Sequence, residues 1–132
     1  MASTALRSWS TTLPSPGADL GLAIEAVRAA GRVAMSFFGG SYRSWEKAPG
    51  DPVSDADIAV DRALTAALRS ARPDDGVVSE ETAADPDQLS RSRIWIIDPI
   101  DGTRAFLKGM PHFAVCAALL VEGVVRTGVV FN

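Results

Sequence analysis

The feature that most constrains this chain is the sequence Asp-Pro-Ile-Asp-Gly at positions 98–102, which directly follows the apolar segment 94–97. That segment is rich in β-branched and aromatic side chains, a composition that favours a buried strand. Because Pro99 lacks a backbone N–H and has a fixed φ angle, we expect the strand to end and the chain to turn there. A turn at a strand end can point the carboxylates of Asp98 and Asp101 into one cleft, an all-oxygen environment suited to Mg²⁺.

An alternative interpretation of this motif needs no metal. A lone Asp-Pro-x-Asp-Gly sequence more often forms a turn in which the aspartates accept hydrogen bonds from local amides and the glycine supplies conformational freedom. Three further acids favour the metal site, since Glu80 and Glu81 follow a second predicted strand at 76–78 and Asp57 lies in the first turn of a predicted helix. Such carboxylates converge only if something offsets their repulsion, as a divalent cation does.

The N-terminal part of the chain predicts an amphipathic helix from Asp19 to about Phe38. Gly31 falls on its apolar face, where the missing side chain lets a neighbouring element approach closely. The expected core positions are Leu20, Ile24, Val27, Ala34 and Phe38. We expect Gly39-Gly40 to end this helix and the segment 41–52, with its Gly and Pro residues, to form a connector without regular structure.

The rest of the chain predicts a second helix and four strands. The helix begins at Ser54, whose hydroxyl can cap a free backbone N–H, with Asp57 three residues later in a capping-box-like position. Its expected core face consists of Ile58, Leu64, Ala67 and Leu68, and the turn-forming segment 72–76 ends it. The strands are predicted at 76–78, 94–97, 113–120 and 124–131, the last two separated by a short turn.

Composition limits the classes of partner and compartment. The formal net charge of -3 gives no general electrostatic reason to bind a nucleic acid polymer or an anionic membrane surface. No uninterrupted apolar stretch reaches the roughly 18 residues of a membrane span. The single cysteine, Cys116, lies in an apolar run, so we expect a buried structural thiol and no internal disulfide. A soluble protein in a reducing, cytoplasmic compartment is compatible with these features.

Residues 1–17 form a separate compositional segment. They are rich in Ser, Thr, Pro and Ala, and Arg7 is their one charged side chain. The segment lacks both the continuous apolar stretch of a secretory signal and the several arginines of a transit peptide. We therefore expect a flexible tail at 1–17, followed by one domain at 18–132.

Around the acidic motif, the sequence closely resembles the signature of the inositol monophosphatase family. The resemblance runs from Trp95 to Thr103 and includes Phe106. Upstream, the segment 51–57 resembles the family's D-x-V-T-x-x-D sequence, with a serine for the usual threonine, and 79–81 resembles its G-E-E sequence, with a serine for the glycine. The resemblance covers roughly residues 19–132 and implies a layered α/β (α+β) fold, with paired helices packed on a mainly antiparallel sheet as in the N-terminal half of the sugar-phosphatase fold.

The resemblance also implies a metal site and a way in which the family completes it. Glu80, Asp98, Asp101 and the backbone carbonyl of Ile100 would bind catalytic Mg²⁺. Family members continue beyond the position of Asn132 through a second α/β region that supplies a further aspartate ligand and much of the substrate pocket. The domain is therefore expected to be incomplete at its C-terminal side.

Roles in catalysis follow from the same resemblance. Glu80 and Thr103 would orient and activate the attacking water, and Asp57 would support this water directly or through Thr103. Asp101, Gly102 and Thr103 would contact the substrate phosphate. Metal ions that lower the pKa of water and hold phosphate oxygens make a covalent phosphoenzyme unnecessary.

Three nearby basic or titratable side chains receive weaker assignments. Lys47 resembles a family lysine upstream of the first acidic motif, although its alignment across the loop is not fixed. His112 is expected to be structural, because the carboxylates already supply a base. Lys108 could contact an anionic substrate, but a solvated side chain is favoured.

The expected function is Mg²⁺-dependent hydrolysis of a small phosphate monoester by metal-activated water. One alternative is a 3′(2′),5′-bisphosphate nucleotidase acting on 3′-phosphoadenosine 5′-phosphate, because Arg104 resembles a basic residue of that branch. Another is a truncated, non-catalytic remnant that binds metal without turnover. An apolar last strand with an exposed edge would also permit a homodimer.

Overall fold

The computed structural model describes residues 13–83 and 85–132. Residues 1–12 of the expected tail lie outside the described residues, whereas Pro16 and Gly17 already belong to helix α1 (Pro16–Phe37). The helix begins earlier than expected because the Ser15 side chain accepts a hydrogen bond from the backbone N–H of Ala18. Pro16 sits in the first turn, where its missing N–H is not needed.

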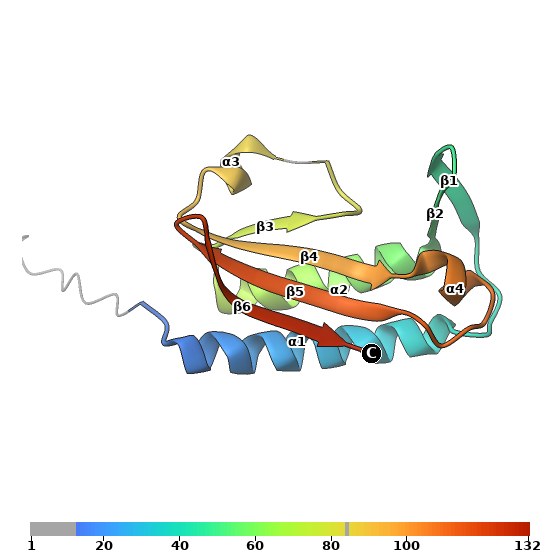
Figure 1. Cartoon of the computed structure of the whole chain (residues 1–132), viewed down its shortest axis with the longest axis horizontal. Helices are drawn as coiled ribbons and strands as arrows, with labels where there is room; N and C mark the ends of the chain where they lie inside the picture. Colours follow the sequence, from blue (N-terminus) through green and yellow to red (C-terminus); the bar gives the residue numbers. More distant parts are fainter. Residues whose placement is uncertain (1–12, 84) are drawn as a thin grey trace, which may run out of the picture.

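Two helices and a four-stranded sheet make up most of the structure (Figure 1). The elements that follow α1 are β1 (Ser44–Ala48), β2 (Asp51–Ser54), α2 (Asp55–Ala71), β3 (Gly76–Ser79), α3 (Pro86–Leu89), β4 (Arg93–Asp101), α4 (Thr103–Leu107), β5 (Ala114–Val121) and β6 (Val124–Phe131). The sheet order is β3-β4-β5-β6, with β3 parallel to β4 and the other neighbours antiparallel. The expected mainly antiparallel sheet with paired helices is confirmed.

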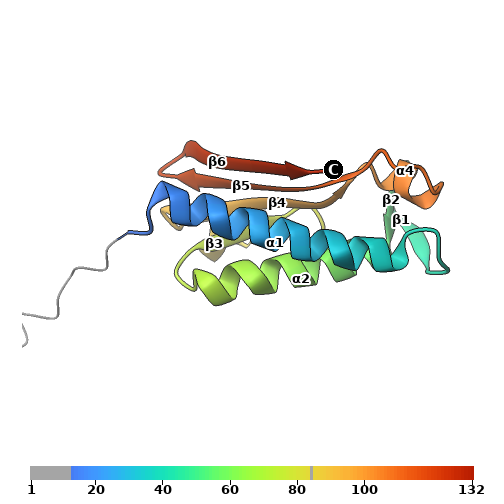
Figure 2. The same cartoon turned by 90° about the horizontal axis from the view of Figure 1, so that it is seen from below.

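The helices α1 and α2 lie side by side on one face of this sheet (Figure 2). The core between these helices and the sheet contains Trp95, Phe106, Leu64, Leu68 and Leu119, each fully buried. The opposite face of the sheet carries apolar side chains such as Ile96, which is 42% exposed. Within the described residues, no helix is long and apolar enough to cross a membrane.

Of the core positions expected on α1, Val27 and Ala34 are buried, Ile24 and Phe38 are half-buried, and Leu20 is exposed. The buried face of α1 includes Ala23, Ala26, Val27, Ala30, Gly31 and Ala34. Leu20 was expected in the core and is 43% exposed instead, because close helix packing selects the alanine stripe. The expectation for Gly31 is confirmed, since a Cβ built there would lie 2.7 Å from the Phe131 ring.

The segment 41–52 was expected to lack regular structure, and that expectation is wrong. Residues 44–54 form the antiparallel hairpin β1–β2, which stands at the same end of the molecule as α4 (Figure 1). Its Gly and Pro residues serve the hairpin: Gly50 takes a positive φ of 76° in the turn. Pro52 pairs with Glu46 in a two-stranded ribbon, where a missing N–H is tolerated at an edge.

Helix α2 begins as the sequence predicts. The Ser54 side chain accepts from the N–H of Asp57, and the Asp57 carboxylate accepts from the N–H of Ser54, so the capping box is complete. Leu64 and Leu68 are fully buried, while Ile58 and Ala67 are half-buried. The short helix α3 (Pro86–Leu89) lies in a segment for which the sequence predicted no element.

Strand β4 does not end at Pro99, contrary to expectation. The strand continues to Asp101, and its pairing with β5 is irregular between Asp98 and Asp101. A bulge of this kind lets a strand absorb a residue that cannot donate to the ladder. Pro99 is fully buried within the strand.

Candidate metal centre and active site

The acidic motif lines a cleft of about 370 Å³ at the end of β4. The turn after β3 contributes Glu80 and Glu81, the bulged end of β4 contributes Asp98, Ile100 and Asp101, and the start of α4 contributes Thr103. The β1–β2 hairpin closes the remaining side with Lys47, Gly50, Asp51 and Pro52. Segments far apart in the sequence thus meet at one end of the sheet.

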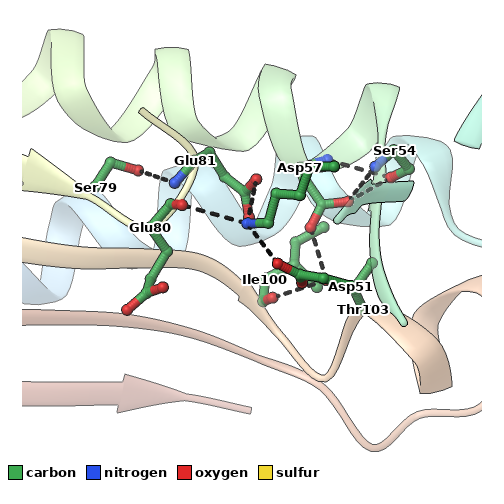
Figure 3. Close-up of polar contacts among 9 residues, drawn as sticks. Asp51, Ser54, Asp57, Ser79, Glu80, Glu81, Ile100 and Thr103 are labelled. Atoms are coloured by element: carbon green, nitrogen blue, oxygen red, sulfur yellow. Dashed lines mark hydrogen bonds and ion pairs between the residues drawn. The ribbon is translucent and has the colours of Figure 1, made fainter. Parts of the chain in front are cut away.

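A chain of hydrogen bonds joins Thr103 to the cap of α2 (Figure 3). The hydroxyl of Thr103 lies 2.8 Å from Oδ1 of Asp57, and the hydroxyl of Ser54 lies 2.6 Å from Oδ2 of the same carboxylate. Asp57 is fully buried, and its two oxygens are held by these donors and by the N–H of Ser54 at 2.8 Å. The carboxylate is therefore fixed in orientation and accepts the single Thr103 hydroxyl proton.

Gly102 fills a position that no other residue fits well. Its φ angle is 95°, and a Cβ built there would lie 2.5 Å from the backbone carbonyl oxygen of His112. This close approach places Thr103 at the first position of α4, facing Asp57. What His112 contributes here is its backbone, while its side chain is exposed.

Lys47 links the hairpin to the acidic turn after β3. Its Nζ donates to the carbonyl oxygen of Glu80 and to Oε2 of Glu81, both at 3.3 Å, and lies 3.8 Å from Oδ2 of Asp51. Burial opposes the charged ammonium, but the hydrogen bond and charge of Glu81 prevail and raise the pKa of Lys47. The pKa of Glu81 is also raised, because burial outweighs the stabilisation from Lys47.

Asp98 lies where negative charge accumulates. Burial, followed by the charges of Asp101 and Glu80, raises the pKa of Asp98 from 3.8 to about 6. Glu81 and Asp57 add smaller contributions of the same sign. Of the two cationic side chains that line the cleft in the described part of the chain, Lys47 pairs with Glu81 and Arg104 donates to the carbonyl of Gly50, so neither forms an ion pair with Asp98.

The structure brings some of the expected ligands together and leaves others apart. Glu80, Asp98, Asp101 and the Ile100 backbone border one cleft, yet among the described residues no three acidic, histidine or cysteine side chains converge closely enough to hold an ion. Figure 3 shows the Glu80 carboxylate turned away from Thr103, on the other side of the turn from Glu81. Glu80 is exposed, so its side chain can rotate.

These residues fit Mg²⁺ in their chemistry. Each of the four expected donors offers oxygen, which hard divalent cations prefer, and the raised pKa of Asp98 marks an unbalanced negative charge at the same place. A divalent cation bound by Glu80, Asp98, Asp101 and the Ile100 carbonyl would neutralise that charge.

The sequence missed part of the site and overestimated other parts. Ser54 was expected only as a helix cap, but it also orients Asp57, and the signal was already present in the capping-box spacing. Arg104 lines the cleft and donates to the carbonyl of Gly50 in the hairpin turn. Lys108 is exposed, as expected for a solvated side chain. Cys116 is half-buried on the open face of the sheet, where burial and then Asp101 and Asp98 raise its thiol pKa.

Comparisons with known proteins agree with this geometry. The model of the inositol monophosphatase family matches residues 19–132. The chain is 43% identical over 84% of its length to a Streptomyces griseus protein named glucose-1-phosphate thymidylyltransferase. It is 39% identical over 85% of its length to a histidinol-phosphatase of Chlorobaculum parvum, and 40% identical over 86% to an inositol-1-monophosphatase of Mesorhizobium japonicum. The chain spans only 42% of the first of these relatives and 43% of the other two.

Solved structures give the same picture. The extragenic suppressor protein suhB of Bartonella henselae superposes with a TM-score of 0.80 at 34% identity, over 87% of this chain and 45% of that one. An IMPase of Thermotoga maritima superposes with a TM-score of 0.78 at 32% identity, over 85% of this chain and 43% of that one. The match therefore extends over the sheet, the paired helices and the acidic cleft described above.

Proposed function

This chain belongs to the inositol monophosphatase family, and on that premise we propose that it carries the catalytic part of a Mg²⁺-dependent hydrolase of small phosphate monoesters. The single observation that carries the proposal is the Thr103–Asp57–Ser54 hydrogen-bond chain, which ends at the cleft bordered by Glu80, Asp98 and Asp101. A phosphatase needs both parts: carboxylates for a divalent cation and a polar group that orients the attacking water.

In this arrangement the hydroxyl hydrogen of Thr103 points towards Asp57. Its hydroxyl has one hydrogen, and the Asp57 oxygen at 2.8 Å is a nearer and stronger acceptor than the Ile100 carbonyl oxygen at 3.2 Å. The Thr103 oxygen is then left as an acceptor for a proton of the attacking water. The Asp57 carboxylate stays in this orientation because the Ser54 hydroxyl donates to its other oxygen.

We assign the second water proton to the Glu80 carboxylate, after a side-chain rotation that brings it towards Thr103. Bound Mg²⁺ would supply electrostatic stabilisation of the phosphate and a lowered pKa of the water. Gly102 and the first backbone N–H groups of α4 border the same cleft, which suits a phosphate oxygen.

The substrate class within the family is a finer proposal. The relatives carry the names of enzymes for different phosphorylated compounds, so family membership leaves the choice among inositol monophosphates, histidinol phosphate and related monoesters. A 3′(2′),5′-bisphosphate nucleotidase is the alternative. Arg104 supports it, because its guanidinium lines the cleft, where a second phosphate would meet a positive charge.

Phosphate release tests the proposal. The wild-type chain is incubated with Mg²⁺ and, separately, with inositol 1-phosphate, histidinol phosphate and 3′-phosphoadenosine 5′-phosphate. We expect Mg²⁺-dependent release with at least one of them, a loss of at least about 100-fold for Asp101→Asn, and retention of most activity for Thr103→Ser, which keeps the hydroxyl.

The alternative of a non-catalytic metal-binding remnant makes the opposite prediction. It predicts a folded wild-type chain, judged by circular dichroism, that is stabilised by Mg²⁺ but releases no phosphate from any of these substrates. That result would overturn the catalytic proposal for this chain.

A further inference from the structure

A second cavity, of about 560 Å³, lies between α2, β3 and the segment that leads to α3. This volume is within the range of about 300–1,000 Å³ typical of small-molecule sites. Its polar lining includes Asp61, Thr65, Ser79 and Thr82, the exposed Arg62 and Arg69, and Asp85, whose carboxylate caps α3. Except for Ser79, which neighbours Glu80 in sequence, none of these side chains has a place in the proposed reaction.

Asp61 is the unusual residue in this cavity. It is only 7% exposed, and its Oδ1 atom is buried without a hydrogen-bond partner among the described residues. The other buried aspartates, Asp19, Asp57 and Asp75, each accept hydrogen bonds from two or more donors. A buried carboxylate oxygen without a hydrogen-bond partner is unfavourable, so a compensating ligand is expected at this position.

We propose that this cavity binds a monovalent cation at Asp61, either an alkali metal ion or the ammonium group of a small amine. Of the two described carboxylates that line the cavity, only Asp61 is buried, since Asp85 is exposed and caps α3, so a single positive charge would balance the buried one. Thr65 lies one helical turn further along the same face of α2, and Thr82 lines the cavity from the facing segment, so hydroxyl oxygens are available as further donors.

Two observations limit the choice of ligand. A divalent ion would call for further carboxylates, and the other carboxylate of this cavity, Asp85, is exposed and already accepts a hydrogen bond from the N–H of Asp87. Arg62 and Arg69 line the cavity too, but both are exposed, and solvent screens their repulsion of a cation bound at the buried Asp61.

Thermal unfolding in different salts tests the proposal. The wild-type chain is unfolded without Mg²⁺ in NaCl, KCl or ethylammonium chloride, and in tetramethylammonium chloride of the same ionic strength, because the tetramethylammonium ion offers no N–H donor. We expect at least one of the three compact cations to raise Tm saturably, by about 4 °C at ten times its midpoint. NaCl or KCl acting alone identifies an alkali ion, and ethylammonium acting alone identifies an amine.

Asp61→Asn is the decisive variant, because it keeps the shape and removes the charge. We expect Asp61→Asn to abolish the difference in Tm between the salts, and Thr65→Val to reduce that difference. If Asp61→Asn fails to fold, the dependence of Tm on salt in the wild type and in Thr65→Val still tests the proposal. The same salt response must persist in Asp98→Asn, which removes charge from the acidic cleft.

Three results would overturn the proposal: equal Tm of the wild type in all four salts, an Asp61→Asn or Thr65→Val chain that keeps the full salt response, or loss of that response in Asp98→Asn. A higher Tm of Asp61→Asn in every salt, with no cation dependence in the wild type, would mean that the buried charge has no ligand.

Discussion

The two ends of strand β4 differ in whether their buried carboxylates are paired with cationic side chains. At its beginning, Arg93 donates to Asp19 at 2.8 Å and to Asp75 at 3.0 Å, and the indole N–H of Trp95 donates to Asp75 at 2.9 Å. At its other end, Asp98 is surrounded by like charges that, together with burial, raise its pKa to about 6. One strand therefore carries a balanced network at one end and an unbalanced one at the other.

The difference separates structure from chemistry. Paired carboxylates at the beginning of β4 join α1, the turn before β3 and the sheet, and they offer no free charge to a ligand. At the other end, burial and neighbouring carboxylates raise the pKa of Asp98, and such perturbed groups are common at sites that bind a cation or catalyse a reaction. Four substitutions test this contrast, from the largest expected effect to the smallest.

Arg93→Ala should have the largest effect. It leaves Asp19 and Asp75 buried with less compensation, and removing one partner of a buried ion pair costs about 3–5 kcal/mol of unfolding free energy. Urea unfolding measures this loss. Arg91→Ala is the matched control, because Arg91 pairs with the exposed Asp87 and such pairs contribute about 0–1 kcal/mol. Similar losses for both arginines would contradict the balanced network.

Ser54→Ala should destabilise the chain by about 1–2 kcal/mol, because it removes the cap of α2 and one of the donors to the buried Asp57. Ser54→Thr retains the hydroxyl and should cost less than about 0.5 kcal/mol. Urea unfolding again provides the measurement. If the chain hydrolyses phosphate monoesters, Ser54→Ala should also reduce kcat by a larger factor than it changes KM. An unchanged kcat would mean that Ser54 acts only as a cap.

Asp98→Asn should stabilise the Mg²⁺-free chain by about 1 kcal/mol at pH 8, a value discounted because Asp98 is half-buried. Its folded pKa of about 6 lies above the ordinary 3.8, so the native state binds more protons than the unfolded state between these values. The stability contributed at this position therefore falls as pH rises from 4 through 6.

Unfolding of wild type and Asp98→Asn in EDTA from pH 4 to pH 8 checks this prediction. The advantage of the variant should shrink towards pH 4, and Mg²⁺ should stabilise the wild type more than the variant. A variant that is less stable than the wild type at pH 8 without metal would show that the charge at Asp98 is balanced after all.

Lys47→Met should have the smallest effect, about 0.5–1 kcal/mol, because Lys47 is one-third exposed and its ion pair with Glu81 is partly screened. Removing the ammonium should raise the pKa of Glu81 further, and NMR titration of the Glu81 carboxyl carbon measures this shift. Lys108→Met serves as a control, since Lys108 is exposed. No change in the Glu81 pKa would mean that the hairpin does not hold the acidic turn electrostatically.

Local patterns in the sequence determined much of this protein. The Ser54–Asp57 capping box, the apolar strand before Asp98, the close approach at Gly31 and the family motif all depend on neighbouring residues or on a fixed spacing, so they were predictable. The resemblance to the family also implied that Glu80, Asp98 and Asp101 share one site, and these three residues border one cleft.

Tertiary structure alone decided the rest. The pairing of Arg93 with Asp19, 74 residues away in sequence, has no local signal. The same holds for Oδ1 of Asp61, which is buried without a hydrogen-bond partner in the part of the chain that the structure describes. The burial of the alanine stripe instead of Leu20 depends on which neighbour packs against α1. Likewise, strand β4 continues past Pro99 because pairing with β5 accommodates a bulge that the proline by itself does not specify.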